Sequence, residues 1–229
     1  MRRDSAQMSE RFRLGALLAL AGGFLDAYTY LTRGGVFANA QTGNMVLLGI
    51  NLLEGQWARA GSYLVPILAF AAGVLAAEWV RRRCQHRAGL HWRQRMVAAE
   101  IVILAGVALL PHSYSWVANV LVSFTCALQV ESFRKLRGRA FATTMCTGNL
   151  RSGTELLFRA LTTGEQEEAR GCLRYYGVIL FFIAGAVLGG VACARWGEYA
   201  VLCCCVLLFI AFVMMFRGEK GLAESETAL

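Results

Sequence analysis

Residues 34–44 of this sequence read GGVFANAQTGN, and residues 138–149 read GRAFATTMCTGN. The second stretch is longer by one residue, and both stretches end in the tripeptide Thr-Gly-Asn. Internal similarity is the first pattern to seek in a sequence, because a missed repeat leads to the wrong fold. The duplicated Thr-Gly-Asn segment predicts that the chain consists of two related halves.

The similarity extends to both sides of the duplicated segment. Upstream, Asp26 in GFLDAYTYL corresponds to Glu131 in LQVESFRKL. Downstream, ILAFAAGVLAA around Gly73 corresponds to ILFFIAGAVLG around Gly185. Three matches in the same order are hard to attribute to chance, so they favour a duplication.

The composition is that of a membrane protein. Of the 229 residues, 57% are hydrophobic and 17% are charged, whereas soluble domains carry about 25% charged residues. A helix needs about 20 apolar residues to cross a bilayer. Six apolar blocks are predicted to cross it, at about 14–32, 62–80, 96–111, 115–133, 174–194 and 198–216.

Two further stretches are poor candidates for crossing helices. The apolar part of residues 37–53 is short, and residues 142–161 contain Arg151, Glu155 and Arg159. Each such charge costs about 2.5–3.5 kcal/mol at the centre of the bilayer. We therefore expect both stretches to enter the membrane and return to the side from which they came.

The basic residues support this arrangement through the positive-inside rule. With six crossings and a cytoplasmic N-terminus, all of the 23 lysines and arginines lie inside except Arg33, Arg59 and Arg195. With eight crossings, about half of them would lie outside. The sequence therefore predicts a multi-pass protein of the bacterial inner (plasma) membrane with both termini in the cytoplasm.

The predicted fold is an all-α integral membrane protein with six transmembrane helices in two halves of three. Because three crossings is an odd number, the halves must insert in opposite orientations, each with a re-entrant Thr-Gly-Asn half-helix. Inverted repeats of this kind are common in transporters. The expected organisation is an N-terminal cytoplasmic tail (1–13), a first membrane repeat (14–111), a second, inverted repeat (112–216) and a C-terminal cytoplasmic tail (217–229).

The segments GFLDAYTYL, GGVFANAQTGNMVLLG and CTGNLRSG resemble the YoaK family of uncharacterised bacterial membrane proteins. In that family of unknown function, an acidic residue in the first span and a Thr-Gly-Asn signature recur. The resemblance covers about residues 14–216. It implies a multi-span protein of the bacterial inner membrane, and it supplies no substrate.

The two half-helices predict a binding site at the centre of the membrane. Each threonine is a good N-cap residue, each glycine permits a tight turn, and each asparagine both donates and accepts hydrogen bonds. Two helix N-termini that meet there would each carry about half a positive charge, which suits a small polar or anionic solute. The alternative is that the tripeptides only cap and pack the half-helices. The candidate residues are Thr42, Gly43, Asn44, Thr147, Gly148 and Asn149.

Asp26 and Glu131 are further candidates, because carboxyl groups inside a membrane are costly and are functional by default. Asp26 could bind a cation, carry a proton, or accept a structural hydrogen bond from an amide of the Thr-Gly-Asn segment. Glu131 could instead form an interfacial ion pair with Arg134 or Lys135. We expect the residues lining a pathway to be Gln41, Asn119, Gln129, Arg151 and Glu155.

Each lining residue also has a structural interpretation. Asn119 and Gln129 could form interhelical hydrogen bonds. Arg151, Glu155 and Arg159 are spaced by four residues, so they could form a solvated, internally paired face. Gly185, Gly189 and the small residues around Gly73 are expected to be packing seams.

The favoured function is a transporter or channel for a small solute, without enzymatic activity. We expect no cofactor, no metal site and no nucleic-acid partner; the partners would be the lipid bilayer and a small solute or ion, and homo-oligomer formation is left open. One alternative is a non-transporting scaffold or sensor that uses the basic residues 81–95. The other is a membrane enzyme acting on lipid, although no nucleophile–base pair is recognisable.

Overall fold

The computed structural model describes residues 2–84, 91–133, 135–136, 139–140, 144 and 146–226, and the side chains of residues 12–84, 91–133, 144 and 146–216. The described chain is almost entirely helical. A two-stranded antiparallel pair joins Lys135–Leu136 (β1) to Arg139–Ala140 (β2). The helices are α1 (Arg2–Thr32), α2 (Gln41–Leu53), α3 (Trp57–Cys84), α4 (Trp92–Val107), η1 (His112–Tyr114), α5 (Ser115–Ser132), α6 (Cys146–Thr163), α7 (Gln166–Trp196), η2 (Gly197–Ala200) and α8 (Val201–Glu226).

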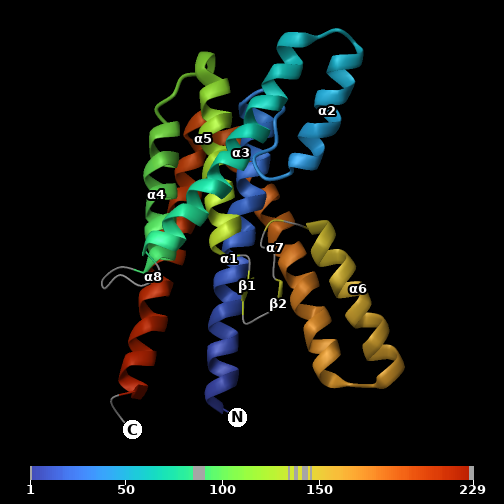
Figure 1. The fold of residues 1–229 in the computed structure, drawn as a ribbon, viewed down its shortest axis with the longest axis vertical. Coiled ribbons are helices and arrows are strands. Elements are labelled where there is room, and N and C mark those ends of the chain that lie inside the picture. The colour runs from blue at the N-terminus through green and yellow to red at the C-terminus, as the bar shows by residue number, and fades with distance from the viewer. Residues whose placement is uncertain are drawn as a thin grey trace.

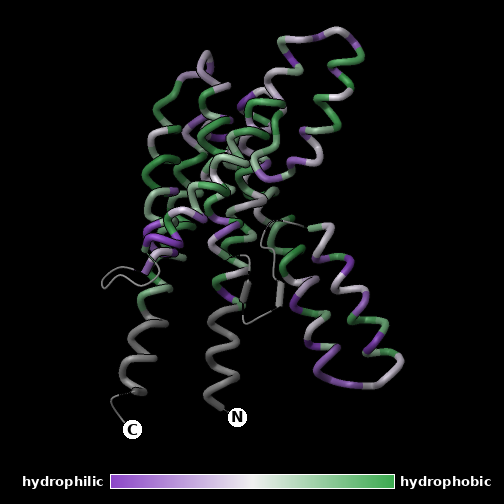
Figure 2. Tube along the Cα trace, in the orientation of Figure 1, coloured by the Kyte–Doolittle hydropathy of each residue, from purple (hydrophilic) through white to green (hydrophobic). Residues whose placement is uncertain are grey.

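The long helices run roughly along the long axis of the molecule, and both termini lie at the same end (Figure 1). The tails expected at residues 1–13 and 217–229 continue the helices of the adjoining spans, because α1 begins at Arg2 and α8 ends at Glu226. Figure 2 shows that hydrophobic residues dominate most of the long helices, with hydrophilic residues gathered near helix ends and connections.

Three segments of the described chain are long and apolar enough to cross a membrane: Phe12–Thr32, Trp57–Cys84 and Gln166–Phe216, the last of which contains α7 and most of α8. Most of the first segment is buried in the protein, whereas most of the other two is exposed. Large exposed apolar surfaces of this kind mark contact with lipid or with another protein. The chain is therefore a membrane protein.

The helices α4 and α5 are short for membrane spans. α4 has 16 residues and α5 has 18. Of the large hydrophobic residues of α5, Trp116 alone is exposed. α5 is therefore enclosed by other helices, which explains why its surface can be more polar than that of α3 or α7.

The first helix of each half packs against a helix of the other half. α1 packs along α7, and α3 packs along α5. A Cβ atom added to Gly185 would lie 2.0 Å from the carbonyl oxygen of Leu20, and one added to Gly73 would lie 2.5 Å from that of Phe124. These small-residue seams confirm the packing role expected from the sequence, since small residues let helix backbones approach closely.

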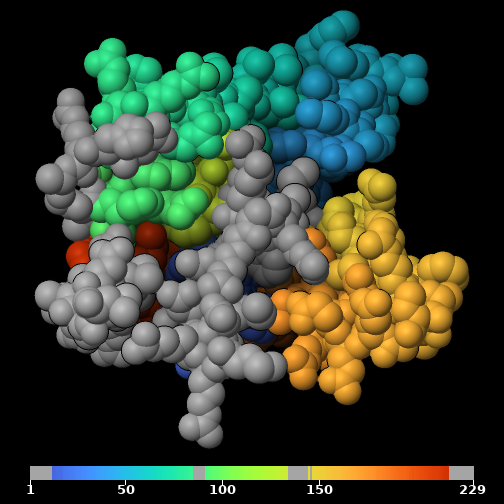
Figure 3. Space-filling model, turned by 60° about the horizontal axis from the view of Figure 1, so that its bottom comes forward, coloured from blue at the N-terminus to red at the C-terminus, as the bar shows by residue number. Residues whose placement is uncertain are grey.

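The short helices α2 and α6 pack on α3 and α7, respectively. α2 begins near the middle of the molecule and runs toward one end, while α6 begins near the middle and runs toward the other end (Figure 1). In the space-filling view the yellow start of α6 lies beside blue α2 (Figure 3). At 1.5 Å per residue, the 13 residues of α2 extend about 20 Å, less than the thickness of a bilayer.

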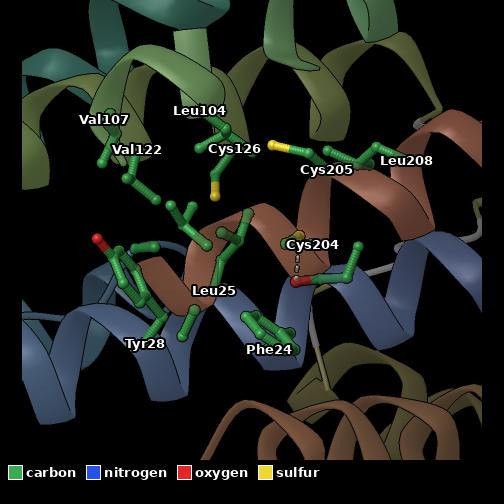
Figure 4. Packing of buried hydrophobic residues seen from close by; sticks show 14 of the residues in the cluster. Phe24, Leu25, Tyr28, Leu104, Val107, Val122, Cys126, Cys204, Cys205 and Leu208 are labelled. Carbon is green, nitrogen blue, oxygen red and sulfur yellow. Dashed lines mark hydrogen bonds between the residues drawn. The ribbon is translucent and has the colours of Figure 1, made fainter. Parts of the chain in front are cut away.

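The main hydrophobic core lies between α1, α4, α5 and α8. Figure 4 shows Phe24 and Leu25 of α1 facing Leu104 of α4, Cys126 of α5 and Leu208 of α8. The cysteines described are all free, and four of them (Cys126, Cys193, Cys204 and Cys205) belong to this core. This agrees with their expected role as small hydrophobic residues.

A candidate site where the two short helices begin

One short segment of α1, residues 22–26, contacts the chain that leads into both short helices. Asn39, just before α2, donates a hydrogen bond from Nδ2 to the carbonyl oxygen of Gly22 (3.1 Å). Thr144, just before α6, lies against the same glycine, because a Cβ added to Gly22 would meet its methyl carbon at 2.5 Å. Cys146, the first residue of α6, lies close enough to Asp26 to interact with it electrostatically. Both short helices therefore begin beside the same turn of α1.

Asp26 holds the beginning of α2. Its buried carboxylate accepts a hydrogen bond from the backbone amide of Asn39 (2.6 Å), and the amides of Ala38 and Ala40 also point to it. Unpaired amides at a helix N-terminus favour an anionic acceptor. Asp26 thus makes a structural hydrogen bond, but its partner is the amide of Asn39 and not the expected amide of the Thr-Gly-Asn tripeptide.

The N-cap role predicted for Thr42 and Thr147 is wrong. α2 begins at Gln41, its N-cap is Ala40, and no side chain of the helix itself caps it. α6 begins at Cys146, so Thr147 lies within its first turn. Asp26 of α1 instead accepts hydrogen bonds from the chain just before α2.

Asn44 fixes the extended chain that leads into α2. Its side chain is fully buried. Its Oδ1 accepts a hydrogen bond from the amide of Phe37 (3.0 Å), and its Nδ2 donates to the carbonyl oxygen of Phe37 (2.8 Å) and to Oε1 of Gln41 (3.0 Å). Its polar atoms are therefore engaged within the protein, and Asn44 positions the site instead of facing a solute.

The corresponding residues of the second half are also buried. Glu131 and Asn149 are 8% and 2% exposed, and both have interaction partners. Residues 141–143 and 145, which would correspond to the chain leading into α2, lie outside the described residues. The burial of Asn149 parallels that of Asn44, which agrees with the correspondence seen in the sequence.

The threonines of the two tripeptides are the residues that face outward. Thr42, Thr147 and Gly148 are exposed and Gly43 is partly buried. Neither threonine hydroxyl has a hydrogen-bond partner within the described structure. The first turns of the two helices thus present hydroxyl groups that have no partner in the described structure. The chain before α2, beside them, is fixed by hydrogen bonds to Asp26 and Asn44.

Of the other residues expected to line a pathway, Gln41 lies at the beginning of α2 beside Asn44, whereas Arg151 and Glu155 lie further along α6. Gln41 donates a hydrogen bond to the carbonyl oxygen of Ala38 (2.9 Å). Glu155 pairs with Arg159 at 2.5 Å on a face that is about half exposed, and Arg151 is exposed on the same helix. This arrangement fits the paired, solvated face that the sequence offered as the alternative.

Asn119 and Gln129 of α5 form hydrogen bonds with the backbone of α1 and of the residue that follows it. The Asn119 Nδ2 group donates to the carbonyl oxygen of Arg33 (2.7 Å), and the Gln129 Nε2 group donates to that of Leu18 (3.1 Å). The interhelical role considered for these residues is therefore confirmed. Their amide oxygens are buried without hydrogen-bond partners in the described structure.

Sequence reasoning overlooked Asn39 and Glu100. Asn39 lies in an irregular segment and was not distinguishable from an ordinary loop asparagine. Glu100 is fully buried on α4, and its position within the apolar block 96–111 was a signal that could have found it, since a charged residue inside a span is a candidate functional residue. Within the described residues, no group of three or more metal-binding side chains is present.

The apolar spans, the two short helices and the buried polar groups at their ends define a multi-span membrane protein. Residues 14–214 match the model of a family described as "Protein of unknown function (DUF1275)", and the chain belongs to that family. It is 26% identical over 220 residues to the UPF0700 transmembrane protein YoaK of Bacillus subtilis (strain 168), covering 92% of this chain and 97% of that one. No solved structure matches the chain.

Proposed function

We propose that this protein is a transporter or channel for a small polar or anionic solute, which binds between the first turns of α2 and α6. The observation that carries this proposal is the contact of Asn39 and Thr144, from the two halves, with the same residue, Gly22. Irregular backbone within a membrane is tolerated only inside protein or beside water. Its presence in both halves at one position favours a shared site.

We also propose that the halves are inverted repeats of three spans each, with α2 and α6 as re-entrant half-helices. Exchanging the halves replaces α1 by α5 and α7 by α3, so the pair α1–α7 becomes α5–α3. Both pairs are packed in the structure, as are the corresponding pairs α2–α3 and α6–α7. This correspondence supports the repeat. Six crossings place both termini on the cytoplasmic side of the bacterial inner membrane.

The solute would meet hydroxyl groups rather than bare amides. Asp26 already accepts a hydrogen bond from the chain leading into α2, while Thr42 and Thr147 are exposed. A hydroxyl both donates and accepts hydrogen bonds, so it can bind a neutral polar molecule or an anion. The negative charge of Asp26 opposes the positive end of the helix, which favours the neutral polar solute.

The test is solute flux into vesicles that contain the purified protein, followed by light scattering with urea, glycerol, formate and nitrate as probes. We expect the wild type to conduct at least one of the probes. Thr42→Val and Thr147→Val should each lower this flux roughly two- to tenfold, because each loses one hydrogen bond to the solute, which is worth about 0.5–1.5 kcal/mol. Thr162→Val, near the far end of α6, is the control and should retain the flux. Equal flux in all four proteins would overturn the assigned site.

A further inference from the structure

Glu100 of α4 is fully buried, and neither of its carboxylate oxygens has a hydrogen-bond partner among the described residues. Within the described residues, no basic side chain forms a salt bridge with Glu100. An ionised carboxyl group buried without a counter-charge costs several kcal/mol. A proton or a water molecule is therefore required to satisfy this group.

Glu100 lies close enough to Cys126 of α5 to interact with it electrostatically, and Cys126 belongs to a row of buried side chains on that helix. Asn119, Ser123 and Cys126 are spaced by four and three residues, so they lie on one face of the helix, and Gln129 continues the row three residues further. Together they extend along about 15 Å of helix. All four are buried, and Asn119 Oδ1, Ser123 Oγ and Gln129 Oε1 have no partner in the described structure. We call these four residues the polar stripe of α5.

Among the described residues, no cation forms an ion pair with Glu100. The thiols of Cys126 on α5 and of Cys204 and Cys205 on α8 lie close enough to interact with it electrostatically. Figure 4 shows Cys126 and Cys205 beside Leu104, one turn beyond Glu100 on α4. Asp26 of α1 also lies close enough to Cys126 to interact with it electrostatically. Toward α3, Arg95 donates a hydrogen bond to Cys84 near the start of α4.

Arg33, a buried cation just after α1, is engaged elsewhere. Arg33 donates hydrogen bonds to the carbonyl oxygens of Val107 and Leu110. Val107 lies seven residues beyond Glu100, which is about 10 Å along the helix. Arg33 therefore does not serve as a counter-ion for Glu100.

We propose that the polar stripe of α5 holds a file of water molecules and that Glu100 binds and releases a proton along it, so that the proton is the coupling ion of this transporter. On binding, an oxygen of the Glu100 carboxylate takes a proton from a water-borne hydronium ion, which neutralises the side chain. On release, the O–H bond breaks and the proton returns to water on the other side. The coupling rests on the proposed transport function; the proton site itself does not.

The position of Cys126 suggests how the protonation of Glu100 affects the solute site. Asp26 and Glu100 both lie close enough to this thiol to interact with it electrostatically, and two negative charges in an apolar interior repel each other strongly. A proton on Glu100 removes that repulsion and stabilises the charge of Asp26. Because Asp26 holds the beginning of α2, the protonation of Glu100 changes how firmly that helix is held.

Infrared difference spectroscopy of the full-length protein in lipid membranes, recorded while the pH is changed, tests the proton site directly. We expect the carbonyl band of a protonated carboxyl group to disappear as the pH rises in the wild type, and this band to be absent from Glu100→Gln. The control is Glu78→Gln, whose glutamate pairs with Arg81 at a partly exposed site, and it should retain the band. Identical spectra for the wild type and Glu100→Gln, or a Glu100 band that persists unchanged at every pH, would overturn the proposal.

Chemical labelling of the wild type gives a second measurement that needs no variant. A protonated carboxyl group in apolar surroundings adds to dicyclohexylcarbodiimide, forming an O-acylisourea that rearranges to a stable N-acylurea. Mass spectrometry should find this adduct on the peptide that contains Glu100, in decreasing amount as the pH rises. Absence of the adduct at every pH would contradict the proposal.

The two hypotheses fail in different experiments. Thr42→Val and Thr147→Val should lose solute flux and keep the Glu100 infrared band. Glu100→Gln should keep flux down a solute gradient and lose solute accumulation driven by a pH gradient. If accumulation in Glu100→Gln equals that of the wild type, the coupling role is wrong even where the solute site is correct.

Discussion

At the scale of single residues, this protein uses side chains to satisfy backbone groups that its irregular segments leave unpaired. Asp26 accepts a hydrogen bond from the amide of Asn39, and Asn44 forms hydrogen bonds with both the amide and the carbonyl group of Phe37. In a bilayer, each unsatisfied backbone group costs several kcal/mol. The polar residues Asp26 and Asn44 near the Thr-Gly-Asn segment are therefore structural, and the exposed threonines are the residues that we propose to contact the solute.

Asn44→Ala should lower the free energy of unfolding by about 2 kcal/mol, because it removes the partners of the part-buried amide and carbonyl group of Phe37. Asn51→Ala is a matched control on the same helix. Asn51 is also buried, but it donates only to the carbonyl oxygen of Leu47, one turn earlier. Thermal unfolding in detergent, followed by tryptophan fluorescence, measures both variants. Equal losses would show that the clamp on Phe37 does not stabilise the fold.

Arg33 ties the end of α1 to the end of α4. It is 1% exposed and donates hydrogen bonds to the carbonyl oxygens of Val107 (3.3 Å) and Leu110 (3.1 Å) and to the hydroxyl of Tyr28 (2.9 Å). It thus supplies donors to carbonyl groups at a helix C-terminus, which have no partner within the helix.

Arg33→Lys should therefore destabilise the protein by roughly 2–4 kcal/mol, because a single ammonium group cannot replace the planar fork of a guanidinium. Arg59→Lys, at an exposed position, should change stability by less than about 0.5 kcal/mol. Both arginines are predicted from the sequence to lie on the non-cytoplasmic side of the membrane. They therefore share charge and location, and the comparison isolates the effect of burial. Similar melting temperatures for the two variants would contradict the role of Arg33.

At the scale of helices, close packing through glycine determines which elements pair. A Cβ atom at Gly23 would lie 1.9 Å from the carbonyl oxygen of Phe182, and one at Gly189 would lie 2.8 Å from that of Phe24. Backbone atoms cannot move aside as a flexible side chain can, so α1 and α7 would have to separate. The position of the site on α1 depends on this seam.

Gly23→Ala should consequently destabilise the protein by about 2 kcal/mol or more, the cost of overpacking. Gly190→Ala is the matched control on α7. A Cβ there would have its nearest neighbour, the Leu31 Cδ1 atom, at 3.7 Å, and alanine has the better helix propensity. Size-exclusion profiles after graded heating compare the two variants. A Gly23→Ala protein as stable as Gly190→Ala would exclude the tight seam.

The start of α6 offers a natural probe of water access. Cys146 is partly exposed, whereas Cys126 and Cys204 are buried. If the beginnings of the short helices line a hydrated path, a small charged methanethiosulfonate reagent should modify Cys146 in membranes and reduce solute flux. Cys146→Ser removes the target and should protect the flux. Absence of modification under conditions that modify a denatured sample would indicate that lipid or protein seals this position.

At the scale of the whole molecule, the two short helices run in opposite directions along the long axis, and both termini lie at one end (Figure 1). An even number of crossings is expected when the termini share a side. In the proposed inverted repeat, the turn between α2 and α3 faces the outside and the turn between α6 and α7 faces the cytoplasm.

Gln56→Cys and Glu165→Cys place a thiol in these two turns. With Cys84, Cys146 and Cys203, the partly exposed cysteines of the described residues, replaced by serine, a membrane-impermeant maleimide should label Gln56→Cys in intact cells and label Glu165→Cys only after the cells are opened. Both positions are exposed, so accessibility differs only through the membrane. Labelling of both from the same side would contradict the inverted repeat.

The sequence alone determined the class of protein and the main elements. Apolar block length predicted the helices, because in a bilayer a crossing segment must be apolar and must satisfy its own backbone hydrogen bonds. It also located the two Thr-Gly-Asn segments and the glycine seams at Gly73 and Gly185. These features are local, so they can be read from neighbouring residues.

Only the tertiary structure decided which side chains meet. Asp26, rather than Thr42, holds the beginning of α2, and Glu100 lies among cysteines of two other helices. Neither fact follows from spacing along the chain, because each depends on how α1, α4, α5 and α8 pack. Hydrogen-bond partners and burial are properties of that packing, whereas a helix in a membrane is largely a property of its own sequence.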